Sequence, residues 1–365
     1  MNIEQLVRRC VVKVKPYQPG KPIEEVKREL KLQNVYKMAS NENALGPSPK
    51  ALKALKTSIC NIHQYPDANA FYLKKALAKK YKLFPENIII GNGSDEIITL
   101  VLRSFINKGD EVIIAEPTFL IYKLAATLAD AKVISVPLKA FRYDLPAMRK
   151  RINTKTKIIF IANPDNPTGT YVTDTEVSDF LKNIPPTVIV FFDEAYFEFA
   201  QKRDYPKTMQ YIRKGNIIVS RTFSKVYGLA GLRIGWAAAG REMIGYLNQV
   251  REPFSVNSLA QIAAQAALKD QKHLQKTKQL VREQMQYLTK EFKALNLFFV
   301  PSVTNFILVN IGINTELVTK KLLSKGIIVR NMQGWGLKNF IRVTIGKPKE
   351  NKLLILELRK IKGGA

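Results

Sequence analysis

Short apolar runs alternate with amphipathic stretches along the first two thirds of the chain. Between them fit a helix that opens with a capping box at Thr173 and Glu176, and a turn at Gly109 and Asp110. This alternation predicts an α/β fold with a largely parallel central sheet. Five runs have the length and β-branched composition of buried strands, at residues 88–90, 112–115, 158–162, 188–192 and 217–220.

The pattern changes after Asn257. A long helical pattern continues to about residue 295, and strand-like runs at 305–311 and 340–345 are followed by helical stretches at 316–324 and after Pro348. This texture predicts a smaller α+β domain. The N-terminal stretch carries a loop with Pro16, Tyr17, Pro19 and Gly20, and we expect it to pack on the smaller domain. The predicted division is an N-terminal segment over 1–43, a large domain over 44–260 and a small domain over 261–365.

Polar clusters follow the ends of the predicted strands. They read GNGSDE, PTF, NPDNPTG, DEAY and RTFSK. In parallel sheets of this kind, ligands bind beyond the carboxyl ends of the strands. The sequence therefore predicts one site at that edge of the large sheet.

The composition is that of an ordinary soluble protein, with 46% hydrophobic and 24% charged residues among 365. No apolar run approaches the roughly 20 residues of a membrane helix, and the first residues lack the apolar stretch of a secretory signal. We therefore expect a cytoplasmic protein without a membrane partner. The only cysteines, Cys10 and Cys60, and the only histidines, His63 and His273, suggest neither a disulfide framework nor a metal site.

The net charge is unusual, because 58 Lys and Arg residues against 30 Asp and Glu residues give +28. Such a charge attracts polyanions, so a nucleic-acid-binding protein is an alternative hypothesis. The lysines are scattered along helical stretches, and no basic tail, zinc spacing or aromatic RNA-binding signature accompanies them. We interpret the charge as a solvated basic surface that also favours small anions such as phosphates and dicarboxylates.

Lys225 is the first candidate for chemistry. It follows a strand within RTFSKVYGLAGLRIGW, with Thr222 and Ser224 before it and Arg233 after it. A lysine amine forms an imine with a carbonyl cofactor when neighbouring cations or desolvation favour its neutral form. The two hydroxyls and the arginine are suited to a phosphate ester. The alternative for Lys225 is a solvated surface charge.

Two further motifs carry groups that suit a pyridine cofactor. Asp193 ends an apolar strand, where its carboxylate can hold a ring nitrogen protonated, and Tyr196 and the Asn166 amide can reach a phenolic oxygen. The alternatives are a helix cap for Asp193 and a simple turn for NPDNPTG.

The GNGSDE and PTF motifs complete the candidate site. Gly93 permits a tight turn from strand to helix, and free N–H groups of Ser94 and Asp95 at the helix start can bind a phosphate. Phe119 can stack on a flat ring. The alternatives are a structural glycine turn and a core aromatic residue.

Together these motifs resemble the aspartate-aminotransferase-like pyridoxal-phosphate enzymes of fold type I, and among them the histidinol-phosphate aminotransferase family. The resemblance runs almost end to end, through PYQPGKPIEEV, SNENALGPSP, QYPDANA, GNGSDEII, NPDNPTG, DEAY, RTFSKVYGLAGLRIG, IIVRN and FIRVTIG. It implies a large domain with a mostly parallel sheet and a smaller α+β domain. The sequence departs from the family at Ala44, Phe119 and Asp165, where a Pro, a Tyr or Trp and an Asn are frequent.

The resemblance implies a role for each candidate. Lys225 is the imine-forming lysine and proton carrier, Asp193 the partner of the pyridine nitrogen, and Tyr196 with Asn166 the partners of the phenolic oxygen. Phe119 stacks on the cofactor ring. The implied cofactor is pyridoxal 5'-phosphate, and its implied phosphate ligands are Gly93, Ser94, Asp95, Thr222, Ser224, Arg233 and, across a homodimer interface, Tyr65.

The implied reaction is a transamination that interconverts histidinol phosphate plus 2-oxoglutarate and imidazole acetol phosphate plus glutamate, in histidine biosynthesis. Arg342 matches the arginine that takes the carboxylate of glutamate, and Arg330 with Tyr17 are the candidates for the substrate phosphate, with Asn166 nearby. Surface ion pairs are the alternative for both arginines. Another enzyme of the same scaffold, an aromatic-amino-acid aminotransferase or a phosphothreonine decarboxylase, is the alternative function.

Overall fold

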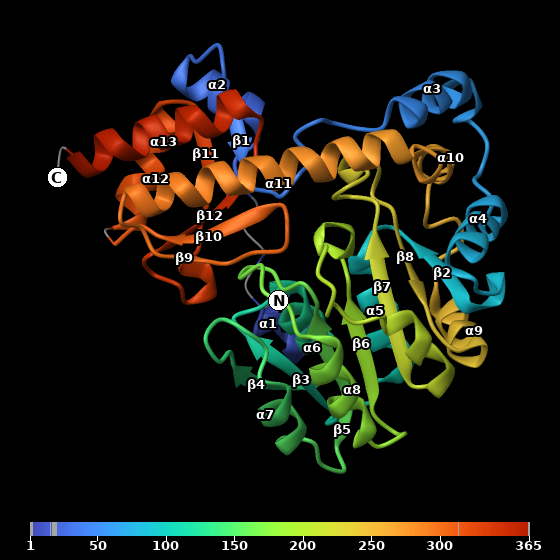
Figure 1. The fold of residues 1–365 in the computed structure, drawn as a ribbon. Helices are drawn as coiled ribbons and strands as arrows, with labels where there is room; N and C mark the ends of the chain where they lie inside the picture. Colours follow the sequence, from blue (N-terminus) through green and yellow to red (C-terminus); the bar gives the residue numbers. More distant parts are fainter. Residues whose placement is uncertain (1–2, 15, 17–19, 313, 364–365) are drawn as a thin grey trace.

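In this computed structural model, residues 3–14, 16, 20–312 and 314–363 are described, and they form two β-sheets joined by one long helix (Figure 1). The larger sheet has seven strands in the order β2-β8-β7-β6-β5-β3-β4, and only β8 runs antiparallel to its neighbours. The predicted α/β fold with a mostly parallel sheet is confirmed. The strands are β2 (Ile88–Gly91), β3 (Glu111–Glu116), β4 (Lys132–Pro137), β5 (Thr156–Ala162), β6 (Ile189–Asp193), β7 (Ile217–Thr222) and β8 (Gly235–Ala238).

Helices lie on both faces of the large sheet (Figure 1), which explains why its central strands are almost continuously apolar. The capping box predicted at Thr173 and Glu176 begins α8 as expected. The helices of this part are α3 (Pro49–Ser58), α4 (Phe71–Tyr81), α5 (Ser94–Phe105), α6 (Leu120–Leu128), α7 (Leu145–Lys150), α8 (Asp174–Lys182), α9 (Arg241–Val250) and α10 (Ser258–Leu268), with short 3-10 turns η2 (Ile59–Asn61), η3 (Pro85–Asn87), η4 (Phe197–Phe199), η5 (Thr208–Lys214) and η6 (Ala230–Leu232).

The smaller sheet has five strands in the order β1-β11-β12-β10-β9. Strand β1 pairs in parallel with β11, and the other pairs are antiparallel. Its elements are β1 (Tyr36–Met38), β9 (Phe299–Val300), β10 (Phe306–Asn310), β11 (Ile327–Asn331), β12 (Phe340–Thr344), α12 (Thr315–Ser324), α13 (Pro348–Gly363) and η7 (Gln333–Trp335).

The N-terminal segment contacts a helix of the large sheet and adds a strand to the small sheet. It contains η1 (Ile3–Gln5), α1 (Arg9–Val12) and α2 (Ile23–Leu30) before β1 joins the small sheet. In α1, the Cys10 thiol lies 3.7 Å from the Leu128 carbonyl oxygen at the end of α6. The segment therefore reaches from the large sheet's helices to the edge of the small sheet.

The long helical pattern after Asn257 is two helices, α10 and α11 (Gln271–Ala294), separated at Asp270. The Asp270 carboxylate accepts the His273 N–H at 3.2 Å and so caps α11. Helix α11 then runs from the large hydrophobic core, where Leu274 lies, to the small core, where Phe292 lies. The domain boundaries at 43/44 and 260/261 stay predictions.

The strand prediction was incomplete, because β4 and β8 of the large sheet and β1, β9 and β11 of the small sheet were not predicted. Strand β4 lies at a sheet edge and is only partly buried, and β8 has the sequence GWAA, which lacks the β-branched residues of the predicted strands. Among the described residues, no helix combines the length and apolar character needed to cross a bilayer.

Candidate active site

The carboxyl ends of β2, β3, β5, β6 and β7 meet at one edge of the large sheet, and a cavity of about 240 Å³ opens there. The expected position of the site is therefore observed. The predicted residues that line the cavity are Ser94, Asp95, Phe119, Asn166, Asp193, Tyr196, Thr222, Ser224, Lys225 and Arg233.

Lys225 follows β7 and is partly buried at the cavity wall. Its Nζ donates a hydrogen bond to the Ser40 carbonyl oxygen at 3.3 Å and lies 5.6 Å from the centre of the Tyr196 ring. The chain turns tightly after it, because Gly228 has φ 69° and a Cβ there would lie 2.3 Å from the Gly46 carbonyl oxygen. This turn holds the segment after Lys225 against Gly46.

Asp193 ends β6 and is 4% exposed. The Tyr122 hydroxyl donates to Asp193 Oδ2 at 2.7 Å, and the Ala195 N–H donates to Oδ1 at 3.1 Å. Burial raises the pKa of the Asp193 carboxyl to about 6, and the Tyr122 hydrogen bond opposes that rise. A cationic partner strongly stabilises the ionised form of a buried carboxyl, and a protonated ring nitrogen would be such a partner.

Two polar side chains beside Lys225 are held by neighbours. The Asn41 amide donates to the Tyr196 hydroxyl at 2.9 Å, and Arg342 Nη1 donates to the Asn166 side-chain oxygen. Asn41 in turn accepts from the Thr344 hydroxyl at 3.0 Å. The hydroxyl of Tyr196 and the amide of Asn166 are therefore oriented before any ligand binds.

The opposite end of the cavity is suited to an anion. Helix α5 begins at Ser94 with no side-chain cap, so its first N–H groups face this end. Gly93 has φ 81°, and a Cβ on it would lie 2.6 Å from Arg233 Nη2. Thr222 and Ser224 hydroxyls lie 2.9 Å apart beside it, and Arg233 Nη2 lies 3.4 Å from Asp95 Oδ2. Only glycine allows the guanidinium to approach this closely.

A second cavity of about 300 Å³ adjoins the first and shares Ser40, Phe119, Asn166, Tyr196 and Lys225 with it. It adds Arg330 from β11 and Arg342 from β12, whose strands pair with each other. The Arg342 side chain is buried, and its Nη2 donates to the Ala39 carbonyl oxygen at 2.7 Å. The two arginines thus give this cavity a second anion-binding end.

Among the described residues, two predicted residues do not line these cavities: Gly93, which lies against Arg233, and Tyr65. Tyr65 is 82% exposed, its ring stacks on Phe254 at 4.8 Å, and it lines a separate surface hollow that contains neither Lys225 nor Asp193. Tyr17 lies outside the described residues, so the structure does not address it.

The model of the family described as aminotransferase class I and II matches residues 33–358 of the chain. The chain belongs to the aminotransferase class I and II family. The match covers every residue of the two cavities except the N-terminal Gly20.

Relatives of this aminotransferase support the sequence resemblance. The chain is 48% identical over 97% of its length to a histidinol-phosphate aminotransferase of Moorella thermoacetica, covering 92% of that protein. It is 42% identical to histidinol-phosphate aminotransferase 2 of Carboxydothermus hydrogenoformans, over 98% of this chain and 99% of the relative. The predicted resemblance to that family is confirmed.

Solved structures support the predicted fold class. The crystal structure of histidinol-phosphate aminotransferase from Sinorhizobium meliloti in complex with pyridoxal-5'-phosphate superposes with a TM-score of 0.90 at 28% identity, covering 97% of each chain. The aspartate aminotransferase of Thermus thermophilus with maleate has a TM-score of 0.83 at 19% identity, covering 98% of this chain and 99% of that one, which shows the fold alone. The aspartate-aminotransferase-like fold is confirmed.

Several residues around the site of this aminotransferase were not predicted from its sequence. Tyr122 lies in the same EPTFLIY motif as Phe119, where α6 turns it back onto Phe160 in a stacked contact of 4.8 Å. Its place three residues after Phe119 was the available signal. Asn41 and Ser40 lie in SNENALGPSP, but no pattern in the chain indicates that this segment crosses to Tyr196 and Lys225.

Proposed function

We propose that this chain is a pyridoxal-phosphate-dependent aminotransferase that interconverts histidinol phosphate plus 2-oxoglutarate and imidazole acetol phosphate plus glutamate. The observation that carries the proposal is the arrangement of Lys225 between two anion-binding ends, one formed by the α5 N-terminus and Arg233, the other by Arg330 and Arg342. The names of its relatives, at 48% and 42% identity, support the choice of substrate.

The first cavity fits the cofactor at each of its chemical groups. The absence of a Cβ at Gly93 leaves room for a phosphate, and the uncapped start of α5 offers it N–H donors. Ser94, Thr222, Ser224 and Arg233 would help to hold this phosphate. The side chain of Asp95 pairs with Arg233, so its own contribution is its backbone N–H at the helix start.

The residues that would contact the cofactor ring line the same cavity. Asp193 would hold the ring nitrogen, Tyr196 and Asn166 the phenolic oxygen, and Phe119 one face of the ring. Phe119 already stands edge-to-face against Tyr122, with ring centres 5.6 Å apart, so its orientation is restricted.

Bound pyridoxal phosphate supplies a ring that draws electrons away from the reacting carbon. In each half-reaction Lys225 Nζ would move one proton between the substrate Cα and the cofactor carbon that carries the amino group, acting as general base at one carbon and general acid at the other. Its hydrogen bond to the Ser40 carbonyl oxygen holds the amine at the cavity wall. Asp193 keeps the proton on the ring nitrogen, because a carboxylate without nearby water stabilises a cationic partner strongly.

The two substrates share the second cavity. Arg342 binds the carboxylate of glutamate, since its buried guanidinium can form two parallel hydrogen bonds. Histidinol phosphate has no carboxylate, and its phosphate uses Arg330, with Tyr17 as the predicted second contact. The +28 net charge would draw both anionic substrates toward the protein.

The active unit is a homodimer in the cytoplasm, in which Tyr65 of one subunit reaches the cofactor phosphate of the other. The exposed ring of Tyr65, with Phe71 and Tyr72 exposed nearby, supports a protein partner for this surface. Neither a membrane nor a specific nucleic acid is part of the proposal.

The relatives at 48% and 42% identity support this function over the alternative on the same scaffold, an aromatic-amino-acid aminotransferase or a phosphothreonine decarboxylase. An L-threonine-O-3-phosphate decarboxylase from Porphyromonas gingivalis is 23% identical to this chain and shows the shared fold alone.

A substrate panel tests the proposal. The purified holoenzyme should form glutamate from 2-oxoglutarate with histidinol phosphate much faster than with phenylalanine. Lys225→Ala should abolish turnover, whereas Lys182→Ala, which removes an exposed lysine paired with Asp179, should not. Borohydride reduction should attach the cofactor to the peptide that contains Lys225. An enzyme that turns over phenylalanine but not histidinol phosphate would contradict the proposal. A label on another peptide would contradict it as well.

A further inference from the structure

Trp335 lies between the two strands that carry the substrate arginines. It ends η7, the short turn that connects β11, with Arg330, to β12, with Arg342. The side chain is partly buried and lines the second cavity together with Lys225. No motif in the sequence singled it out.

One indole ring contacts both parts of the protein. The guanidinium carbon of Arg330 lies 5.1 Å from the centre of the Trp335 ring, within the range of a cation–π contact. The indole N–H donates to the backbone oxygen of Thr118, on the large-sheet side, at 3.0 Å. The ring therefore links an anion-binding side chain of the small sheet to the loop before Phe119.

Thr118 is a fixed anchor for this contact. It is 5% exposed, and its hydroxyl donates to Asp165 Oδ1 at 2.7 Å while lying 2.6 Å from the Tyr143 hydroxyl. Asp165 adjoins Asn166, so the anchor belongs to the wall that faces Lys225. Movement of the indole relative to Thr118 would change the distance between Arg330 and the reacting amine.

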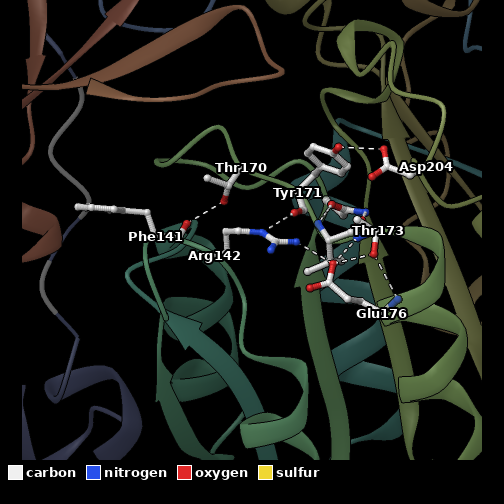
Figure 2. A network of polar contacts seen from close by, with 9 residues as sticks. Phe141, Arg142, Thr170, Tyr171, Thr173, Glu176 and Asp204 are labelled. Atoms are coloured by element: carbon white, nitrogen blue, oxygen red, sulfur yellow. Dashed lines mark hydrogen bonds and ion pairs between the residues drawn. The ribbon is translucent and has the colours of Figure 1, made fainter. Parts of the chain in front are cut away.

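Phe141 makes a separate contact between the two parts. Figure 2 shows its ring pointing away from a polar network in which Arg142 donates to the Tyr171 carbonyl oxygen at 3.2 Å and to Glu176 at 2.7 Å. The Phe141 ring packs on Phe298 and Phe340 of the small-sheet side, with centres 5.9 and 5.6 Å apart. It belongs to the same apolar cluster as Trp335 but does not line the second cavity.

We propose that Trp335 is a positioning residue that sets the reach of Arg330 into the cavity and thereby favours a substrate that carries a phosphate. The inference rests on the proposed function. The ring holds the guanidinium on one side by a cation–π contact and is itself held by the Thr118 hydrogen bond. A phosphate therefore meets a cation whose position is set in advance, which lowers the entropic cost of binding.

Two substitutions separate these contacts. Trp335→Phe keeps a ring beside Arg330 and loses the hydrogen bond to Thr118, while Trp335→Leu loses both. The KM for histidinol phosphate should rise about threefold in Trp335→Phe and about tenfold in Trp335→Leu, with kcat changed by less than about threefold. The KM for glutamate, whose carboxylate is taken by Arg342, should change by less than about twofold.

Phe141→Leu is the matched control, because it weakens a contact between the two parts without touching Arg330. It should leave the KM for histidinol phosphate within about twofold. Titration of each holoenzyme with inorganic phosphate in a calorimeter gives a readout independent of turnover, and phosphate should bind about tenfold more weakly to Trp335→Leu alone.

The outcomes separate this inference from the proposed function. A wild-type enzyme that does not turn over histidinol phosphate would refute the function, and the phosphate titration would still test Trp335. Unchanged KM and phosphate affinity in Trp335→Leu, or equal losses in Phe141→Leu, would overturn the positioning role.

Discussion

The Tyr122 hydroxyl donates a 2.7 Å hydrogen bond to Oδ2 of Asp193, and both side chains are buried. The bond reaches from the helix after β3 to the end of β6, so it links segments that lie on either side of β5 in the sheet. It stabilises the ionised form of Asp193 against a burial effect that raises the pKa of this carboxyl to about 6. Tyr122 therefore helps Asp193 to remain the anion that a cationic ring nitrogen requires.

Tyr122→Phe should lower the activity of the enzyme, because it removes the hydrogen-bond donor to Asp193. The pKa of Asp193 should rise further, and kcat/KM at neutral pH should fall by about tenfold. Tyr171→Phe is the matched control, since it removes a 2.9 Å tyrosine–aspartate hydrogen bond to Asp204 outside the two cavities, as Figure 2 shows. Steady-state kinetics with equal losses in both variants would contradict the role of Tyr122.

The pH dependence of cofactor affinity should reflect the titration of the Asp193 carboxyl. Its pKa of about 6 in the protein without ligand means that it gains a proton as the pH falls through that value. Cofactor affinity should therefore weaken below about pH 6, because a neutral acid no longer balances the ring cation. Absorbance titrations of the protein with pyridoxal phosphate between pH 5 and 8 measure this. Tyr122→Phe should move the transition to higher pH, and a transition that stays in place would argue against the assignment.

Asp165 should make the fold less stable at neutral pH. Burial raises the pKa of this carboxyl to about 6, so the folded state favours the protonated acid. Its contribution to stability is complete below the unfolded pKa of about 4 and is lost as the pH rises to about 6, at a cost of up to about 3 kcal/mol. Asp165→Asn removes this titration.

Relative to wild type, the free energy of unfolding of Asp165→Asn should increase between pH 4.5 and 7.5. The Asn amide can donate to the Thr118 hydroxyl and accept from Thr168, so the hydrogen bonds can be kept. Urea unfolding at both pH values provides the measurement. A constant difference between variant and wild type would refute the argument.

Glu194 and Arg221 form a buried ion pair directly beside the catalytic strand ends. Nη2 of Arg221 lies 2.7 Å from Glu194 Oε2, and the two side chains are 3% and 0% exposed. Arg221→Met should destabilise the protein by about 3–5 kcal/mol, because an unpaired carboxylate is left without water. In the double variant with Glu194→Gln, more than half of this loss should be recovered. A double variant as unstable as the single one would contradict the pairing argument.

The proposed sharing of sites between subunits can be tested by complementation. Tyr65→Ala and Lys225→Ala should each be inactive or nearly so, but in a mixture that is unfolded and refolded together, hybrid dimers would contain one intact site. With random pairing, about a quarter of the wild-type activity should return. Mixtures without recovery, although dimers form, would place Tyr65 in its own subunit's site.

Much of the large domain could be predicted from local sequence, because strands buried on both faces need long apolar runs and the residues after their carboxyl ends must lie at one edge. Strands β4 and β8 were not predicted, since a partly buried edge strand and a strand without β-branched residues do not match this pattern. The motifs at the strand ends indicated Lys225, Asp193, Asn166 and Arg233 because each lies within a few residues of a strand end.

The sequence by itself determined the α/β fold, the edge at which the cavity lies and the residue types that face it, because these follow from periodicity and from motifs a few residues long. Only the tertiary structure decided which distant segments complete the site. Asn41 reaches Tyr196, Tyr122 reaches Asp193, and Trp335 reaches Thr118 across 217 residues of chain. Contacts between residues so far apart depend on how the two sheets pack, and no local pattern of polar and apolar residues records that packing.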